Sequence, residues 1–135
     1  MIDDTWMVTV RTATSSDLDG ARGFIRKLFP KAMVSISEED IIILAEYGRR
    51  IVGFAHVIDN GDRIILQGLG VDDDMRGQGV GTLLLQHILG AIDEDVPVVL
   101  KVKAMNPAVE LYARHGFFVK RSNDETMTLV RRPNA

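Results

Sequence analysis

A glycine-rich segment, residues 71–82, constrains the fold more than any other part of the chain. It lies between an apolar run and a stretch with helical periodicity, and Gly77, Gly79 and Gly81 alternate with larger residues where the backbone must turn. The first amides of a helix have no intrahelical acceptor and lie at the positive end of the helix dipole. The segment therefore predicts a strand–loop–helix unit whose loop binds an anion such as phosphate or pyrophosphate.

The periodicity on either side of this loop predicts an α/β fold. We expect a central sheet of about six or seven strands, mixed in direction but mostly antiparallel, with helices on both faces. The expected strands are residues 6–13, 41–46, 51–58, 63–71, 97–102, 117–120 and 125–130. The expected helices are residues 17–28, 80–92 and 107–115, whereas residues 31–39 suit either a short helix or a loop. The strand over 97–102 should run parallel to the strand over 63–71, because a helix intervenes.

Composition limits the classes of function. The 135 residues suit one domain, residues 1–135, and their net charge of −3 offers no broad basic field for nucleic acid or an anionic membrane. No cysteine is present, so neither a disulfide nor a thiolate nucleophile is expected. No apolar run approaches ~18 residues, and the acidic start is unlike a signal peptide, so we expect a cytoplasmic protein. The consecutive acids Asp72, Asp73 and Asp74 predict a solvated turn, and no metal is expected.

Two motifs about 25 residues apart carry a family resemblance. The first is RGQGVG at residues 76–81, and the second is NPAVELYARHGF at residues 106–117. Together with the order of the elements, they resemble the GNAT superfamily of acyl-CoA-dependent N-acetyltransferases. The resemblance extends over nearly the whole chain, from the first strand to the final hairpin. One departure is Val109, where the family commonly has alanine, and we expect it to alter packing rather than chemistry.

The resemblance implies a cofactor site for acetyl-CoA. In the family the pyrophosphate lies on the amides of the glycine loop, and the pantetheine arm runs along the fourth strand where the fourth and fifth strands separate. Asn106 would then hydrogen-bond the arm, and Thr82 would add a hydroxyl contact to the phosphates. The cofactor-binding residues implied are Leu69, Val71, Arg76, Gly77, Gln78, Gly79, Val80, Gly81, Thr82 and Asn106. Tyr112 matches the family tyrosine that protonates or hydrogen-bonds the leaving thiolate, a role that a phenol can fill.

The general base is the part of the site that the sequence leaves open. Many family members place a glutamate on the fourth strand, but the corresponding positions here are Ile65, Gln67 and Leu69. His56 in the third strand is the first candidate, because an unperturbed imidazole titrates near ~6.5. Glu46 at the end of the second strand is the second candidate. A water molecule held by Gln67 is the third.

The implied reaction is transfer of an acetyl group from acetyl-CoA to a primary amine by direct attack in a ternary complex. The alternative is a module of the same fold that binds CoA or acyl-CoA without turnover. The acceptor is expected to be a small-molecule or peptide amine, and a homodimer is an open alternative. The short segment 30–40 suggests an open acceptor cleft, or one completed by a second subunit. Its acids at 38–40 would suit a cationic amine or form a solvated face.

Overall fold

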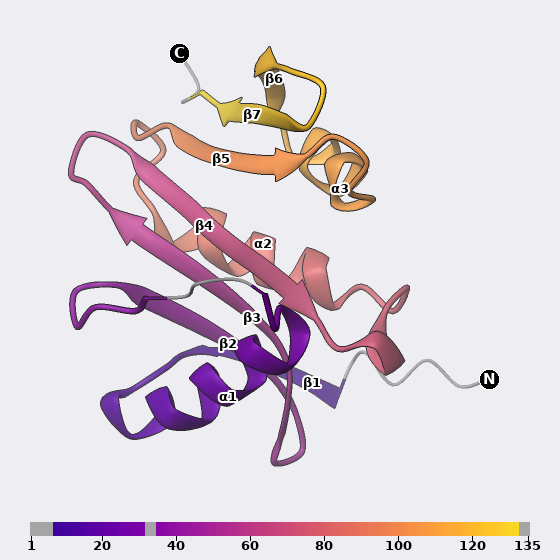
Figure 1. Cartoon of the computed structure of the whole chain (residues 1–135). Coiled ribbons are helices and arrows are strands. Elements are labelled where there is room, and N and C mark those ends of the chain that lie inside the picture. Colours follow the sequence, from indigo (N-terminus) through magenta and orange to yellow (C-terminus); the bar gives the residue numbers. More distant parts are fainter. Residues whose placement is uncertain (1–6, 32–34, 133–135) are drawn as a thin grey trace.

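The computed structural model describes residues 7–31 and 35–132. Its seven-stranded sheet has the order β1-β2-β3-β4-β5-β7-β6, and helices cover both faces (Figure 1). Neighbouring strands are antiparallel except for the parallel pair β4 and β5. The strands are β1 (Val8–Thr12), β2 (Ile41–Tyr47), β3 (Arg50–Asp59), β4 (Ile64–Val71), β5 (Val98–Lys103), β6 (Phe118–Ser122) and β7 (Thr126–Arg131). The mixed α/β fold and the parallel pair are confirmed.

The helices are α1 (Leu18–Leu28), α2 (Val80–Ala91) and α3 (Ala108–Arg114), with short 3-10 segments η2 (Ser15–Asp17) and η3 (Asp73–Met75). The helical alternative for residues 31–39 is not seen in the described part of that segment, because residues 35–40 form a loop and a turn. Residues 32–34, like the expected start of the first strand at Trp6, lie outside the described residues. None of the helices in the described ranges is long and apolar enough to cross a membrane.

Hydrophobic clusters lie on opposite faces of the sheet, and β2 is therefore buried on both sides. Alternate residues of β2 point to alternate faces, so Leu44 packs with α1 whereas Ala45 packs with α2. Phe54 lies opposite Leu44 and therefore shares the α1 face, where its ring meets Phe24 edge to face. His56 lies opposite Ile42 on the same face. The sheet register thus puts a histidine on the apolar side that α1 covers.

Strands β4 and β5 diverge after a short parallel ladder. Only residues 64–66 of β4 pair with residues 98–100 of β5, although β4 continues to Val71 (Figure 1). A β-bulge marks the point of divergence: Leu66 lies opposite Val57 and Gly68 lies opposite His56, so Gln67 is the extra residue. A bulge increases local twist and bends the strand. The backbone of β4 beyond Leu66 therefore has no ladder partner on β5, as a pantetheine arm would require.

Candidate active site

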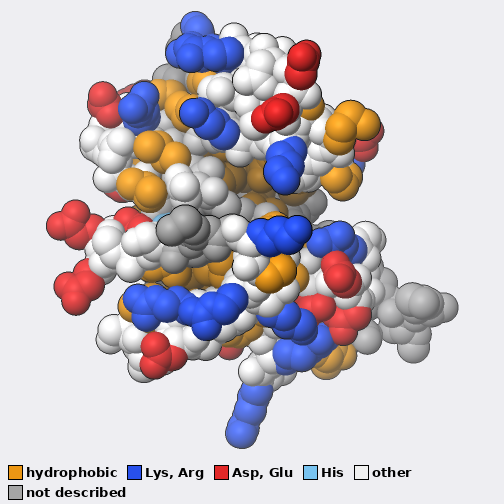
Figure 2. Space-filling model, viewed as in Figure 1, with side chains coloured by type: hydrophobic (Ala, Val, Ile, Leu, Met, Phe, Trp, Pro, Cys, Tyr) orange, Lys and Arg blue, Asp and Glu red, His pale blue; other side chains and the backbone are white. Residues whose placement is uncertain are grey.

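A cavity of about 400 Å³ opens on the α1 side, where β4 leaves β5. Figure 2 shows this side of the molecule, which is hollowed between the β5–β7 strands and α1. Its lining comes from α1, β3, β4, β5, α3 and the segments that follow α1 and β5. The lining residues are Ile25, Phe29, Ser35, Phe54, His56, Leu66, Gln67, Gly68, Leu69, Lys101, Val102, Lys103, Asn106 and Tyr112. Four residues that the sequence predicted as site residues, and the glutamine proposed for a water relay, thus meet in one cavity.

His56 forms a buried pair with Asp40, which precedes β2. The imidazole residue is 4% exposed, and its Nε2 lies 2.8 Å from Oδ2 of Asp40. The same carboxylate accepts hydrogen bonds from the amide and the hydroxyl of Ser37, at 3.1 and 2.9 Å. The hydrogen bond from His56, and then those from Ser37, hold the pKa of Asp40 below its ordinary value despite its burial. Asp40 therefore stays ionised at neutral pH.

An ionised carboxylate only accepts hydrogen bonds, so Nε2 of His56 carries a proton in this pair. When the imidazole is neutral, Nδ1 consequently keeps its lone pair. No buried side-chain nitrogen or oxygen among the described residues lacks a partner, and Nδ1 has no hydrogen bond within that part of the chain. Nδ1 must therefore retain contact with solvent, and the cavity is the space beside it. The arrangement can accept a proton from a group in the cavity.

Asp40 is a candidate functional residue that sequence reasoning missed. Its segment suggested either a cationic-amine site or a solvated acidic face, and Glu38 and Glu39 are indeed exposed. The side chain of Asp40 is only 11% exposed and is engaged by His56. The Ser37-x-x-Asp40 spacing is typical of a local side-chain turn, and this was the available signal. Nothing in the sequence, however, indicates that this turn meets β3.

Tyr112 approaches the cavity from α3. It is 5% exposed and packs its ring against Phe117, with ring centroids 5.6 Å apart. Burial disfavours the phenolate and raises the pKa of Tyr112 to about 12. The phenol therefore keeps its proton throughout the neutral range and is available as a hydrogen-bond donor.

Asn106 lines the same cavity and caps α3. Its Oδ1 accepts a hydrogen bond of 2.8 Å from the amide of Ala108, so its side-chain oxygen is used in the cap. The side-chain NH2 group points away from that bond by geometry and is the group that could donate to a ligand. Capping and ligand binding are therefore compatible at this residue.

The glycine loop has the backbone that the sequence predicted. Gly77 and Gly79 have φ of 78° and 85°, in the left-handed region that favours glycine, and Gly79 immediately precedes α2. The first helical bond runs from the amide of Leu83 to the carbonyl of Gly79, at 3.0 Å. The amides of residues 80–82 therefore have no acceptor within the helix. These amides and the dipole of α2 supply donors and positive potential for an anion.

Gly81 also has a packing role. A Cβ at this position would lie 3.2 Å from Cδ2 of Leu111, so the absence of a side chain lets α2 and α3 approach closely. Two of the loop glycines are thus required by backbone conformation and the third by contact with α3. The sequence motif alone does not separate these reasons.

The acidic run before the loop is only partly solvated, which corrects the prediction of a solvated turn. Asp72 is 8% exposed and lies 3.6 Å from Nζ of Lys27 and 3.7 Å from Nη1 of Arg50. Asp74 also pairs with Arg50, at 2.9 Å. The run therefore anchors the start of the loop to α1 and β3. Within the described residues, no three His, Asp or Glu side chains are grouped so that they could hold a metal ion.

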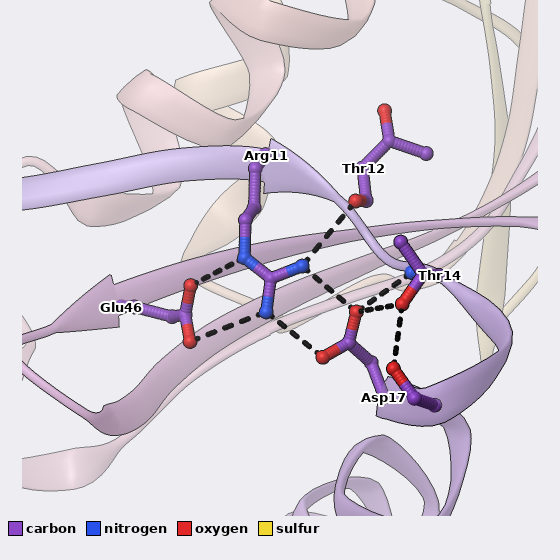
Figure 3. Close-up of polar contacts among 6 residues, drawn as sticks. Arg11, Thr12, Thr14, Asp17 and Glu46 are labelled. Carbon is purple, nitrogen blue, oxygen red and sulfur yellow. Dashed lines mark hydrogen bonds and ion pairs between the residues drawn. The ribbon is translucent and has the colours of Figure 1, made fainter.

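Glu46, the second candidate base, lies outside the cavity lining. Nε of Arg11 donates to its Oε1 at 2.7 Å, and the same guanidinium binds Asp17 at 2.8 and 2.9 Å (Figure 3). The hydrogen bonds from Arg11, followed by those from Thr14, lower the pKa of Asp17. This network ties β1 and η2 to β2. Glu46 is four residues along β2 from the partner of His56, about 13 Å away at ~3.3 Å per residue.

The remaining site residues lie along β4 and in the loop. Gln67 at the bulge and Leu69 line the cavity, whereas Val71 lies beyond it and packs against the α2-side core. Arg76 pairs with Asp73 at 3.0 Å and is largely exposed. Of these residues, Gln67 and Leu69 therefore share the cavity with His56, whereas Val71 and Arg76 lie beyond it.

Comparison with known proteins agrees with this architecture. Residues 12–129 match the family described as acetyltransferase (GNAT) domain. No curated protein sequence gave a significant match. Among solved structures, the Escherichia coli ribosomal-protein-S18-alanine N-acetyltransferase superposes with a TM-score of 0.81 and 22% identity, covering 96% of each chain.

Two plant structures are also similar. Arabidopsis thaliana NAA60 in complex with a bisubstrate analogue has a TM-score of 0.76 and 20% identity, over 94% of this chain and 99% of that one. Arabidopsis thaliana Naa50 in complex with CoA-Ac-MVNAL has a TM-score of 0.75 and 19% identity, over 92% and 97%. These identities establish a shared fold, and the family match extends over most of the sequence. The chain therefore belongs to the GNAT family of acetyltransferases.

Proposed function

We propose that this chain is an acetyltransferase that moves an acetyl group from acetyl-CoA to a primary amine by direct attack in a ternary complex. The observation that carries the proposal is that His56 and Tyr112 line one cavity where β4 separates from β5. A proton acceptor and a hydrogen-bond donor are thereby available on the path that an acyl-CoA would follow. Because the chain has no cysteine, an acyl-cysteine intermediate cannot form, and we favour direct attack of the amine on the thioester.

The geometry of the chain fits acetyl-CoA as the co-substrate. Its pyrophosphate would lie on the amides around Gly77 and Gly79, at the N-terminus of α2. The pantetheine arm would then use the backbone of β4 beyond Leu66, which does not pair with β5. An amide near Leu69 or Val71 would polarise the thioester carbonyl as the tetrahedral oxyanion forms.

His56 is proposed as the general base. An amine attacks only with a free electron pair, so the ammonium form must lose a proton, directly to Nδ1 or through a water molecule near Gln67. Asp40 would hold the ring with Nδ1 toward the cavity and stabilise the imidazolium that forms. The amine nitrogen first bonds to the carbonyl carbon and gives the tetrahedral oxyanion. As the oxyanion collapses, the C–S bond breaks and the electron pair leaves on sulfur. The surplus proton on nitrogen passes to solvent or to the departing thiolate, which leaves a neutral amide.

Tyr112 is proposed to stabilise the leaving thiolate as a hydrogen-bond donor. Its pKa of about 12 lies roughly 3.5 units above that of an ordinary thiol near ~8.5. Complete transfer of the phenol proton to a thiolate of ordinary pKa would therefore be uphill. A hydrogen bond to a charged acceptor nevertheless stabilises it by ~1.5–3 kcal/mol. Of the alternatives for this residue, hydrogen bonding is thus favoured over protonation.

Calorimetric titration with acetyl-CoA and with CoA, followed by thiol release in the presence of an amine panel, tests the proposal. We expect micromolar binding and release that requires an amine. The matched control is Tyr112→Phe, which should bind acetyl-CoA as the parent does and release thiol more slowly. Binding without release from any amine would support the non-catalytic sensor, and absence of binding would refute both functions.

A further inference from the structure

Basic side chains gather on one wall of the cavity. Lys101 and Lys103 occupy alternate positions of β5 and both line the cavity, so they share one face of the strand. Across β7 they lie opposite Thr128 and Thr126, and Thr128 in turn lies opposite Arg121 of β6. Residues opposite one another in antiparallel strands share a face. Lys101 and Lys103 thus line the cavity, and Arg121 lies on the same side of the sheet.

These cations are not compensated by carboxylates of the described chain. None of the described residues that line the cavity is Asp or Glu. Among residues 7–31 and 35–132, no ion pair engages Lys101, Lys103 or Arg121. Asp40 keeps its negative charge, but it is hydrogen-bonded by His56 and Ser37 and is not among the described residues that line the cavity. The ionisable groups facing the cavity are therefore two lysines, a histidine and a phenol.

The lysines lie level with the acyl end of the proposed path rather than with the phosphates. Lys101 and Lys103 line the same cavity as Gln67 and Leu69 of β4. The glycine loop begins only after Val71. The pantetheine arm carries no charge, so it does not neutralise a cation at this level. The basic wall is thus available to the molecule that brings the amine.

We propose that the acceptor is an anionic amine, in which the reacting amino group belongs to a molecule that also bears a carboxylate or phosphate. This inference rests on the proposed acetyltransferase function and names its substrate class. It replaces the cationic acceptor that the acids at 38–40 suggested from the sequence. A free amino acid and a peptide with acidic residues after its N-terminus share the required chemistry. A polyamine lacks it and would be repelled by the lysines.

Thiol release at saturating acetyl-CoA distinguishes these acceptors. The arms are glutamate, a peptide with acidic residues after its N-terminal residue, the same peptide with lysines in place of the acids, and spermidine. We expect the kcat/KM of the acidic peptide or of glutamate to exceed that of spermidine and of the basic peptide by at least tenfold. The difference should shrink as salt is added, because exposed charges are screened. Preference for glutamate over the acidic peptide would identify a small-molecule acceptor, and the reverse a peptide.

Charge reversal at Lys101 and Lys103 tests whether these two lysines cause the preference for anionic acceptors. Lys101→Glu and Lys103→Glu should each lower kcat/KM for the anionic acceptor about three- to tenfold, as expected for exposed ion pairs, and leave the KM for acetyl-CoA unchanged. Arg49→Glu is the matched control, because it makes the same change of charge at an exposed position of the β2–β3 turn. A higher KM for acetyl-CoA with an unchanged KM for the acceptor would assign the lysines to the cofactor and overturn the inference.

The inference and the proposed function fail in different ways. Release with spermidine or the basic peptide, but not with the anionic acceptors, would uphold acetyl transfer and refute the anionic acceptor. Titration of the CoA-saturated protein with the same four compounds gives a readout that needs no turnover. Selective binding of the anionic compounds supports the inference even in a non-catalytic module, whereas binding of none of them overturns it.

Discussion

Replacing the carboxylate of Asp40 by an amide tests how the proposed base works. In Asp40→Asn, the amide oxygen can take the place of Oδ2, which accepts from His56 at 2.8 Å and from the amide of Ser37 at 3.1 Å. The amide nitrogen then faces the hydroxyl of Ser37, which can rotate to accept a hydrogen bond. The geometry of the pair is therefore retained, and the negative charge is removed.

The size of the effect follows from this loss of charge. A hydrogen bond to a charged group contributes ~1.5–3 kcal/mol, compared with ~1 kcal/mol for a neutral pair. The imidazolium that forms as the amine loses its proton therefore forfeits about 1–2 kcal/mol of stabilisation. We expect kcat/KM for the acceptor to fall roughly five- to thirtyfold. His56→Ala, which removes the base itself, should cost more, in the range of ~10²–10⁴ for general-base catalysis.

The assay is thiol release at saturating acetyl-CoA between about pH 6 and 9, with urea unfolding of each variant as the measure of stability. In Asp40→Asn the ascending limb of the pH–rate profile should move to lower pH, because a neutral amide stabilises the imidazolium less than a carboxylate does. Glu39→Gln is the matched control, since Glu39 is an exposed acid in the same turn. If kcat/KM of Asp40→Asn stays within twofold of the parent value and its ascending limb does not move, the positioning role of Asp40 is refuted.

Further predictions concern the loop, the phenol, the excluded acid and acid stability. Gly79→Glu should lower CoA affinity at least a hundredfold in calorimetry, whereas Gly61→Glu, at an equally positive φ of 86° in open space, should bind normally. Tyr112→Phe should reduce kcat about ten- to a hundredfold, with acetyl-CoA affinity within twofold of the parent. A kcat equal to that of the parent would mean that Tyr112 only packs in the core. Glu46→Gln should lower the thermal unfolding midpoint, because a bond to Arg11 is weakened, and leave the pH–rate profile unchanged. Loss of the ascending limb of that profile would instead identify Glu46 as the general base. Because the folded pKa of Asp40 lies below its ordinary 3.8, its contribution to stability should be complete above about pH 4 and should disappear as the pH falls through the lowered value, which acid unfolding of the parent and Asp40→Asn would show.

Much of the fold could be predicted from local patterns. Alternation, helical spacing and turn residues depend on neighbours within a few positions, so the strands and helices were predicted to within about two residues at most ends. The positive φ values of Gly77 and Gly79 likewise follow from local backbone chemistry. Because the loop and the helix after it are contiguous in sequence, the candidate cofactor site was predictable as a unit.

The arrangement of the candidate acid–base residues was decided by tertiary structure. The bulge at Gln67 sets which residues of β3 and β4 lie opposite one another, and alternation along one strand does not reveal it. His56 meets Asp40 across 16 positions because β2 and β3 pair in a particular register. The register of β1 against β2 likewise places Glu46 beside Arg11. Hydrogen bonds between distant segments thus pair Asp40 with His56 and Glu46 with Arg11. The sequence by itself determined the elements and the candidate anion-binding loop, whereas the partners of each ionisable group depended on long-range register that only the folded chain defines.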